Sequence, residues 1–278
     1  MTLDTGWEQV MGVLEPFLEE TKEARLEQQH AELLQARFDE LDQALEAHFA
    51  RTPRTAEVAC RLPQFVDIAL MDKVKALADA PSSKTVTQAQ FAKIIPAVIT
   101  QWEAERKQEV ISFFLAPNRL QNVSPHVDTL DLAIVLFVCG GPCVSSQGGA
   151  VSVLRYPEIL SHPCLHPSME LDETDADDVY TRVAITQHAD EEDEAHLPFD
   201  LARFKSWPGS RQMKYGHHVI RHIVKKLGLD HTSATYSELQ ECDRRLLCTK
   251  CVLEKRQPLA YTWEAAVSTV SSFDAVYD

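Results

Sequence analysis

Apolar residues recur with helical spacing near the start of the chain. Residues 17–50 contain no Gly or Pro, and their larger apolar side chains follow steps of mostly three and four positions: Leu26, Leu34, Phe38, Leu41, Leu45 and Phe49. This period is typical of an amphipathic helix. The polar face is rich in Glu and Gln, so a short coiled coil is an alternative. Fewer than three clean heptads favour packing of this helix against its own domain.

Further helical patterns follow as far as Leu115. A short helix is predicted over about residues 66–80, before the break at Pro81. Thr87 and Gln90 have the spacing of a capping box, which indicates the start of the next helix. Pro96 is expected to kink or end that helix before a longer one over residues 97–115, because proline cannot donate a backbone hydrogen bond.

The second half of the chain has shorter patterns. The apolar run 128–138 leads into Cys139, and residues 150–154 read as a returning strand. Residues 180–186 suggest one strand, and residues 211–227 suggest a helix that stops at Gly228. A second capping box, from Thr235 to Glu238, opens a short helix that we expect to end near Arg245. A closing helix starts near Trp263.

These patterns predict an α+β fold that is mainly α, with a helical N-terminal half followed by small zinc-knuckle β-hairpins and flanking helices. Three parts are expected: an amphipathic N-terminal helix at 1–52, a helical domain at 53–124 and a Cys/His-containing domain at 125–278, with an acidic loop at 170–194. With 278 residues, 45% of them hydrophobic, the chain can build a sizeable core.

The sequence has no apolar run near the roughly 20 residues that span a bilayer, and its N-terminus lacks the pattern of a signal peptide. We therefore expect an intracellular protein, cytoplasmic or nuclear, without a membrane partner. In those compartments, seven cysteines are expected to be thiols or metal ligands rather than disulfides.

The formal charge of −15 is unevenly distributed. Residues 170–194 hold eleven acids against the single base Arg182. Such clusters are usually solvated loops, and a calcium site at residues 172–178 is disfavoured because the Gly and the terminal Glu of an EF-hand loop are missing. The acidic balance also argues against an extended nucleic-acid-binding surface, although it leaves room for a small basic patch.

One stretch concentrates soft metal ligands. Cys139 and Cys143 flank the turn Gly-Gly-Pro, and His162 and Cys164 follow after one intervening segment. A knuckle of this kind supplies two ligands from one turn, so these four residues form a Cys3His set for Zn²⁺. His166 is an alternative to His162, and three buried, inert cysteines are the alternative to a metal site.

Cys248 and Cys251 form a second candidate metal pair. Its missing ligands would have to come from Cys242 with His231, or from His218 and His222; otherwise the pair is a vestige. A thiol–disulfide exchange site is disfavoured because the pair does not sit in a βαβ unit. The sequence also lacks a Gly-x-Ser-x-Gly elbow and a phosphate-binding glycine loop, so we expect no catalytic activity.

The order of these segments resembles a family of uncharacterised proteins from mushroom-forming (basidiomycete) fungi, many of which carry an F-box-type helical segment. The resemblance covers about residues 53–267. The matching residues are Phe137, Cys139, Cys143, Tyr156, Pro157, Leu160, His162, Cys164, Gly228, Leu229, Asp230, Cys248, Cys251, Thr262, Trp263, Ala266 and Val267. Ser268 stands where the family has His, and a Leu-Pro-x-Glu opening is missing at the N-terminus. The resemblance implies a fold, a zinc ion and a role in ubiquitin-ligase recognition.

The leading hypothesis from the sequence is a zinc-stabilised, non-enzymatic protein-interaction module, with an adaptor related to F-box proteins as its sharper form. A nucleic-acid-binding protein with degenerate zinc fingers is the alternative, and the missing Lys/Arg-rich helix after either knuckle counts against it. The third hypothesis is an enzyme of unrecognised type, with a cleft lined by His217, His218, His222 and the acidic clusters.

Overall fold

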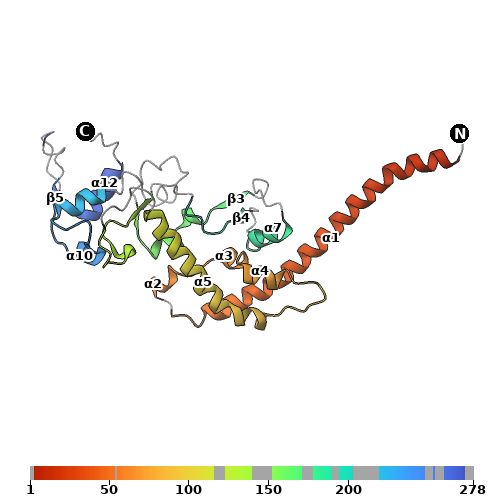
Figure 1. The fold of residues 1–278 in the computed structure, drawn as a ribbon, viewed down its shortest axis with the longest axis horizontal. Coiled ribbons are helices and arrows are strands. Elements are labelled where there is room, and N and C mark those ends of the chain that lie inside the picture. Colours follow the sequence, from red (N-terminus) through yellow and green to blue (C-terminus); the bar gives the residue numbers. More distant parts are fainter. Residues whose placement is uncertain are drawn as a thin grey trace. The chain divides into compact units, whose positions relative to one another are not determined.

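The structure is a computed structural model that describes residues 3–53, 55–115, 123–139, 152–170, 178–189, 194–202, 219–247, 253 and 260–272. These residues form an α+β fold that is mainly α, with three small two-stranded antiparallel sheets (Figure 1). This confirms the fold class predicted from the sequence. The chain divides into two compact units: unit 1 comprises residues 1–52, 64–100 and 168–198, and unit 2 comprises residues 53–63, 101–167 and 199–278.

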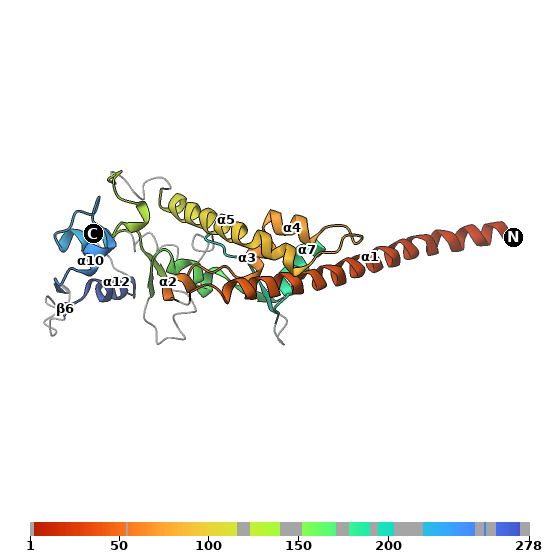
Figure 2. The ribbon, with the colours of Figure 1, turned by 90° about the horizontal axis from the view of Figure 1, so that it is seen from below.

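Unit 1 is built on α1 (Leu3–Phe49), which begins before the predicted start and passes through Gly12 and Pro16. Its second half packs as expected, burying four residues of the apolar series: Leu34, Phe38, Leu41 and Leu45. Its first half does not. Leu26 is exposed, and the helix extends beyond the other elements of unit 1 in both views (Figures 1 and 2). The expectation that the whole helix packs on its own domain is therefore wrong for this half.

Two short helices, α3 (Phe65–Ala69) and α4 (Asp72–Ala78), take the place of the single helix predicted at 66–80. Between them Met71 is extended (φ −70°, ψ 135°) and serves as the N-cap of α4. Both α3 and α4 contact α1. Phe38 of α1 meets the ring of Phe65 edge-on at 5.6 Å between centroids.

A buried arginine fixes the loop after α4. Arg37 of α1 donates hydrogen bonds to the carbonyl oxygens of Ala78, Ala80, Pro81 and Lys84. A buried guanidinium is costly unless its donors are satisfied. These four acceptors supply that satisfaction, and in return the arginine holds the loop that leads to α5.

Residues 180–186, predicted as a strand, belong to the helix α7 (Val179–Thr186). Asp178 caps this helix, because its carboxylate accepts a hydrogen bond from the backbone N–H of Thr181. Tyr180, Val183 and Ala184 then fall on one buried face with steps of three and one. The cap and this face override the strand preference of the β-branched residues. The strands of unit 1 are β3 (Ser168–Glu170) and β4 (Glu194–His196), which pair antiparallel.

The helix α5 (Gln88–Leu115) contributes its first part to unit 1 and its remainder to unit 2. The Gln90 side chain accepts a hydrogen bond from the backbone N–H of Thr87, as the capping box predicts. Pro96 lies inside the helix, so the expected end at this residue is wrong. One missing backbone donor does not terminate a helix that tertiary packing holds on both sides of the proline.

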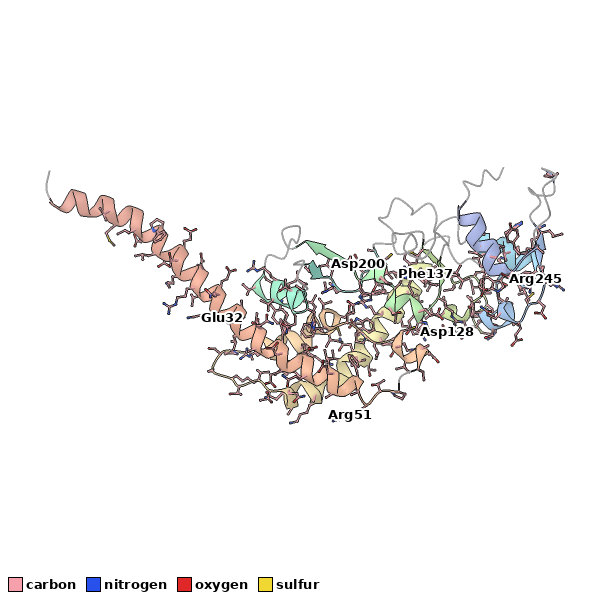
Figure 3. All side chains as sticks on the ribbon, turned by 180° about the vertical axis from the view of Figure 1, so that it is seen from behind. Glu32, Arg51, Asp128, Phe137, Asp200 and Arg245 are labelled. Atoms are coloured by element: carbon pink, nitrogen blue, oxygen red, sulfur yellow. The ribbon has the colours of Figure 1, made fainter. Side chains whose placement is uncertain are left out.

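Unit 2 contains α2 (Ala56–Ala59), the second part of α5 and two hairpins, β1 (Phe137–Cys139) with β2 (Ser152–Leu154) and β5 (Leu246–Leu247) with β6 (Ala260–Tyr261). An aromatic cluster joins α5 to β1, since the Phe137 ring lies 4.8 Å from that of Phe114 and 5.7 Å from that of Phe113. Phe137 is labelled at this position in Figure 3. Leu130 and residues 132–137 of the apolar run are therefore core, although only the end of the run is a strand.

The C-terminal part of unit 2 follows the predicted order. Residues 219–226 are helical, and Gly228 has the positive φ of 80° that glycine adopts at a helix end. The Thr235–Glu238 capping box opens α10 (Tyr236–Gln240), which ends five residues before the predicted position. The closing helix is α12 (Trp263–Ser272). None of the helices among the described residues has the length and apolar composition that crossing a bilayer requires.

Candidate metal centre

The first ligand candidate, Cys139, ends strand β1. The register of the hairpin pairs Phe137 with Leu154 and Cys139 with Ser152. Because Phe137 is anchored among the rings of α5, the strand leads Cys139 into the interior, where 1% of its surface is exposed. A thiol at the end of a fixed strand has little freedom to move away from the site.

The second and third candidates, His162 and Cys164, lie where two 3-10 helices meet: η2 (Glu158–Ser161) and η3 (Pro163–Leu165). Pro163 restricts the residue before it to extended backbone, and His162 has φ −74° and ψ 123°. The chain therefore turns at His162. The buried side chains Ile159, Leu160 and Leu165 hold this turn in the core.

The ligand atoms of Cys139, His162 and Cys164 all lie within 4.8 Å of one another. The Sγ atoms of Cys139 and Cys164 are 3.7 Å apart, and no disulfide joins them. Two sulfurs bound to one tetrahedral Zn²⁺ at about 2.3 Å would be about 3.8 Å apart. The observed spacing is thus that of two ligands of one ion, and it is well above the roughly 2 Å of a disulfide.

His162 is held in the protonation state that binds a metal. Its side chain is buried, with 7% of the residue exposed. Burial, and secondarily the charge of the nearby His166, lower the pKa of His162. The neutral imidazole is the form that can donate a lone pair to a metal ion.

His166, the predicted alternative to His162, is oriented differently. Its Nε2 lies 2.6 Å from the carbonyl oxygen of Leu160, and its ring meets that of Phe199 at 5.6 Å. Among the described residues, the group that can hold a metal ion contains His162 and not His166. The role of His166 is instead to brace the turn from Leu160 to His166.

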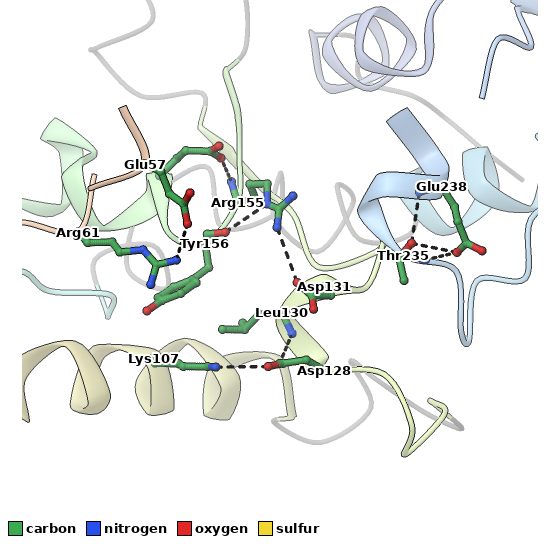
Figure 4. Close-up of polar contacts among 11 residues, drawn as sticks. Glu57, Arg61, Lys107, Asp128, Leu130, Asp131, Arg155, Tyr156, Thr235 and Glu238 are labelled. Atoms are coloured by element: carbon green, nitrogen blue, oxygen red, sulfur yellow. Dashed lines mark hydrogen bonds and ion pairs between the residues drawn. The ribbon is translucent and has the colours of Figure 1, made fainter. Parts of the chain in front are cut away.

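A polar network attaches the metal-binding segment to the rest of unit 2. The Arg61 guanidinium forms ion pairs with Glu57 at 2.9 Å and Glu103 at 2.8 Å. It also lies over the Tyr156 ring, 5.8 Å from the centroid. Burial is the main factor that raises the pKa of the Tyr156 phenol to about 12, with the charge of Glu103 acting in the same direction. Figure 4 shows Glu57, Arg61 and Tyr156 together.

Arg155 provides a second attachment. It donates to the carbonyl oxygen of its neighbour Tyr156 at 3.2 Å and approaches Asp131 at 3.9 Å (Figure 4). It also stacks over the ring of Tyr236, 4.1 Å from the centroid. Sequence patterns did not identify these supporting residues. Their partners are distant in the chain, and no spacing signal connects Arg61 with Glu103 or Arg155 with Tyr236.

Most of the remaining predicted ligands lie in parts of the chain that the structure does not describe. Cys143, the expected fourth ligand, and the pair Cys248 and Cys251 lie outside the described residues, as do His217 and His218. Cys242 is half-buried and His222 is exposed. In the described part of the chain, neither they nor His231 form a second cluster of three ligands. The structure therefore gives three of the four residues of the first site a common location and leaves the second site a prediction.

Comparisons with known proteins found no matching family model, no matching curated protein and no matching solved structure. The resemblance to the fungal family accordingly stays a prediction. The chemistry of the metal centre has to be argued from the residues themselves.

Proposed function

We propose that unit 2 is a zinc-stabilised protein-interaction module without catalytic activity, and more specifically that it acts as an adaptor. The observation that carries this proposal is the convergence of Cys139, His162 and Cys164. Cys139 lies in a hairpin, the other two lie in a turn, and Cys139 and Cys164 are 25 positions apart in the chain. Two thiolates and one imidazole form a soft donor set, which suits Zn²⁺ in tetrahedral geometry better than Mg²⁺ or Ca²⁺.

Cys143 is proposed as the fourth ligand, because a Cys-x-x-x-Cys turn can supply two thiolates to one ion. Four protein ligands close the coordination sphere. A closed Zn²⁺ site stabilises a fold, whereas a catalytic site keeps one position for water or substrate. This is the reason for proposing an interaction module rather than a hydrolase.

The location of the ligands supports a structural role. Strand β1, the turn at His162 and helix η3 share few backbone hydrogen bonds. Among the described residues β1 pairs with β2 alone, and the segments on either side of His162 are 3-10 turns. A metal ion would join these short elements into one body. In small modules, the free energy of metal binding then becomes free energy of folding.

The test is elemental analysis of the purified full chain, combined with thermal unfolding with and without a strong chelator. We expect about one zinc per chain and a lower Tm after chelation. Cys139→Ser and Cys164→Ser should lose the metal, and Cys143→Ser should weaken its binding. Cys60→Ser is the matched control and should retain it, because Cys60 does not belong to the cluster. A metal-free chain whose Tm is unaffected by chelator would refute the proposal.

A further inference from the structure

The first half of α1 carries an apolar stripe that the rest of its unit does not cover. We define the stripe by five exposed residues: Val10, Met11, Leu14, Phe17 and Leu18. Phe17 is the most exposed of them, at 62%. The other four each lie three or four positions from Leu14, so all five lie on one face of the helix. In the sequence, Trp7 continues the same spacing.

The stripe faces away from the side of α1 that packs on unit 1. At about 100° per residue, the stripe and the buried face that includes Phe38 are centred about 150° apart around the helix axis. The buried face carries α3, α4 and α7. Unit 1 therefore cannot cover the stripe by packing further along the helix, and these apolar side chains need a partner from outside the unit.

We propose that the stripe pairs with the same stripe of a second copy of this chain, as a short parallel coiled coil in register. The seam would consist of Val10, Leu14, Phe17 and Thr21, which have the alternating steps of four and three of a heptad repeat. Thr21 is compatible with the seam, because its hydroxyl donates to the carbonyl oxygen of Phe17 at 2.7 Å and needs no other partner.

The charges beside the seam favour a second copy of this chain as the partner and a parallel orientation of the two helices. Glu20 and Arg25 are both exposed, and neither side chain has an ion-pair or hydrogen-bond partner among the described residues. In a parallel in-register pair, positions five apart face each other across the two helices. Glu20 of each copy would then lie opposite Arg25 of the other, which gives two complementary pairs.

The remaining charges permit the same arrangement. Glu15, Glu19 and Glu23 lie at least about 130° from the centre of the seam, farther round the helix than Glu20, so two copies would keep these acids on their outer surfaces. Glu27, six positions after Thr21, already forms an ion pair with Arg182 at 3.2 Å. The other elements of unit 1 would also lie on the outer sides of the pair, because they pack on the opposite face of α1.

The stripe spans about two heptads, so we expect a weak dimer. Sedimentation equilibrium of the full chain should show a shift from one chain toward two as the concentration rises to about 100 μM. Leu14→Asp combined with Phe17→Asp should abolish this shift. Both residues are exposed, so far-UV circular dichroism should show an intact fold. A single-chain mass throughout this range would overturn the proposal, as would a dimer that persists in the double variant.

Charge swaps test the direction of the pair. Glu20→Arg and Arg25→Glu should each weaken dimerisation by about threefold at low ionic strength, because each places like charges across the seam. The double swap should restore it. Glu23→Arg, on the outer face, is the matched control and should leave the dissociation constant unchanged. A double swap that remains as weak as the single variants would overturn the parallel register. Metal content is independent of every one of these outcomes.

Discussion

The Sγ atom of Cys139 lies 3.7 Å from the Sγ atom of Cys164, although the two residues are 25 positions apart in the chain. Neither cysteine is in a disulfide. Two thiols at this distance can share a metal ion, and without the ion they are close enough to be oxidised to each other after a small movement. This relationship leads to the first prediction.

Oxidised glutathione should convert Cys139 and Cys164 into a disulfide in chelator-treated protein, releasing two molecules of reduced glutathione per bond formed. Protein that has not been treated with chelator should react much more slowly, because metal-bound thiolates are not free to attack. Peptide mapping by mass spectrometry identifies the linked residues. Equal rates with and without chelator would contradict a metal site at these thiols.

His162 and His166 should respond differently to substitution. His162→Gln is expected to release the metal, because its imidazole belongs to the ligand cluster. His166→Gln should retain the metal and lower the Tm, because this residue contacts the Leu160 carbonyl and the Phe199 ring. Metal analysis of both purified variants separates the roles. Metal loss in His166→Gln alone would show that the wrong histidine has been assigned.

Arg37 should be a major contributor to the stability of unit 1. Arg37→Met removes the donors of four carbonyl oxygens, and we expect the free energy of unfolding to fall by roughly 2–4 kcal/mol. Arg37→Lys should recover part of this loss, since an ammonium cannot reproduce the fork of a guanidinium. Urea unfolding measures both effects.

The control for Arg37 is Arg51→Met. Arg51 is exposed just after the end of α1, and its side chain has no partner among the described residues. Its substitution should change the free energy of unfolding by less than about 0.5 kcal/mol. Similar losses in both variants would mean that removal of charge, rather than of the carbonyl contacts, causes the effect.

Asp178 should make the stability of α7 dependent on pH. Hydrogen bonds from the hydroxyl and the backbone N–H of Thr181, followed by the charge of Lys75, lower the pKa of Asp178. A carboxylate with a depressed pKa stabilises the fold above its unfolded pKa of about 3.9, and this contribution is lost as the pH falls through the folded pKa. Asp178→Ala should therefore cost about 1 kcal/mol at neutral pH. The difference from the unmodified protein should shrink in acid, where the carboxyl is protonated, to the part that a neutral cap contributes.

Urea titrations at a series of pH values measure that difference. Asp178→Asn is the informative companion variant, because asparagine can still cap the helix but carries no charge. It should retain much of the neutral-pH stability and show a smaller dependence on pH. A gap between Asp178→Ala and the unmodified protein that is as large below the folded pKa as at neutral pH would contradict the assignment to the ionised carboxylate.

Sequence patterns were sufficient for the parts of the structure in which local chemistry and burial agree. The Gln90 side chain that reaches back to Thr87, the full capping box at Thr235 and the stop at Gly228 follow from residues that satisfy or permit the local backbone. The grouping of Cys139, His162 and Cys164 could be predicted because few residue types bind soft metal ions and these lie near turns.

Other features depended on tertiary context. The residues of α7 have strand preference, yet the Asp178 cap and the contact of Tyr180 with Phe38, 5.2 Å between ring centroids, favour a helix. Gly12 and Pro16 suggested that α1 would begin only at residue 17. The period of α1 predicted a helix correctly but could not show that its two halves present apolar faces in different directions.

Substitution of Co²⁺ into the metal-free full chain is the most direct test of the central claim, because Co²⁺ reports the geometry and the donor atoms of a zinc site. We predict one Co²⁺ per chain, with the intense visible bands of tetrahedral coordination and sulfur-to-metal charge-transfer bands in the near ultraviolet. The charge-transfer bands should decrease in Cys139→Ser and Cys164→Ser and persist in Cys60→Ser. A weak octahedral spectrum without charge-transfer bands would contradict a metal centre built on Cys139, His162 and Cys164.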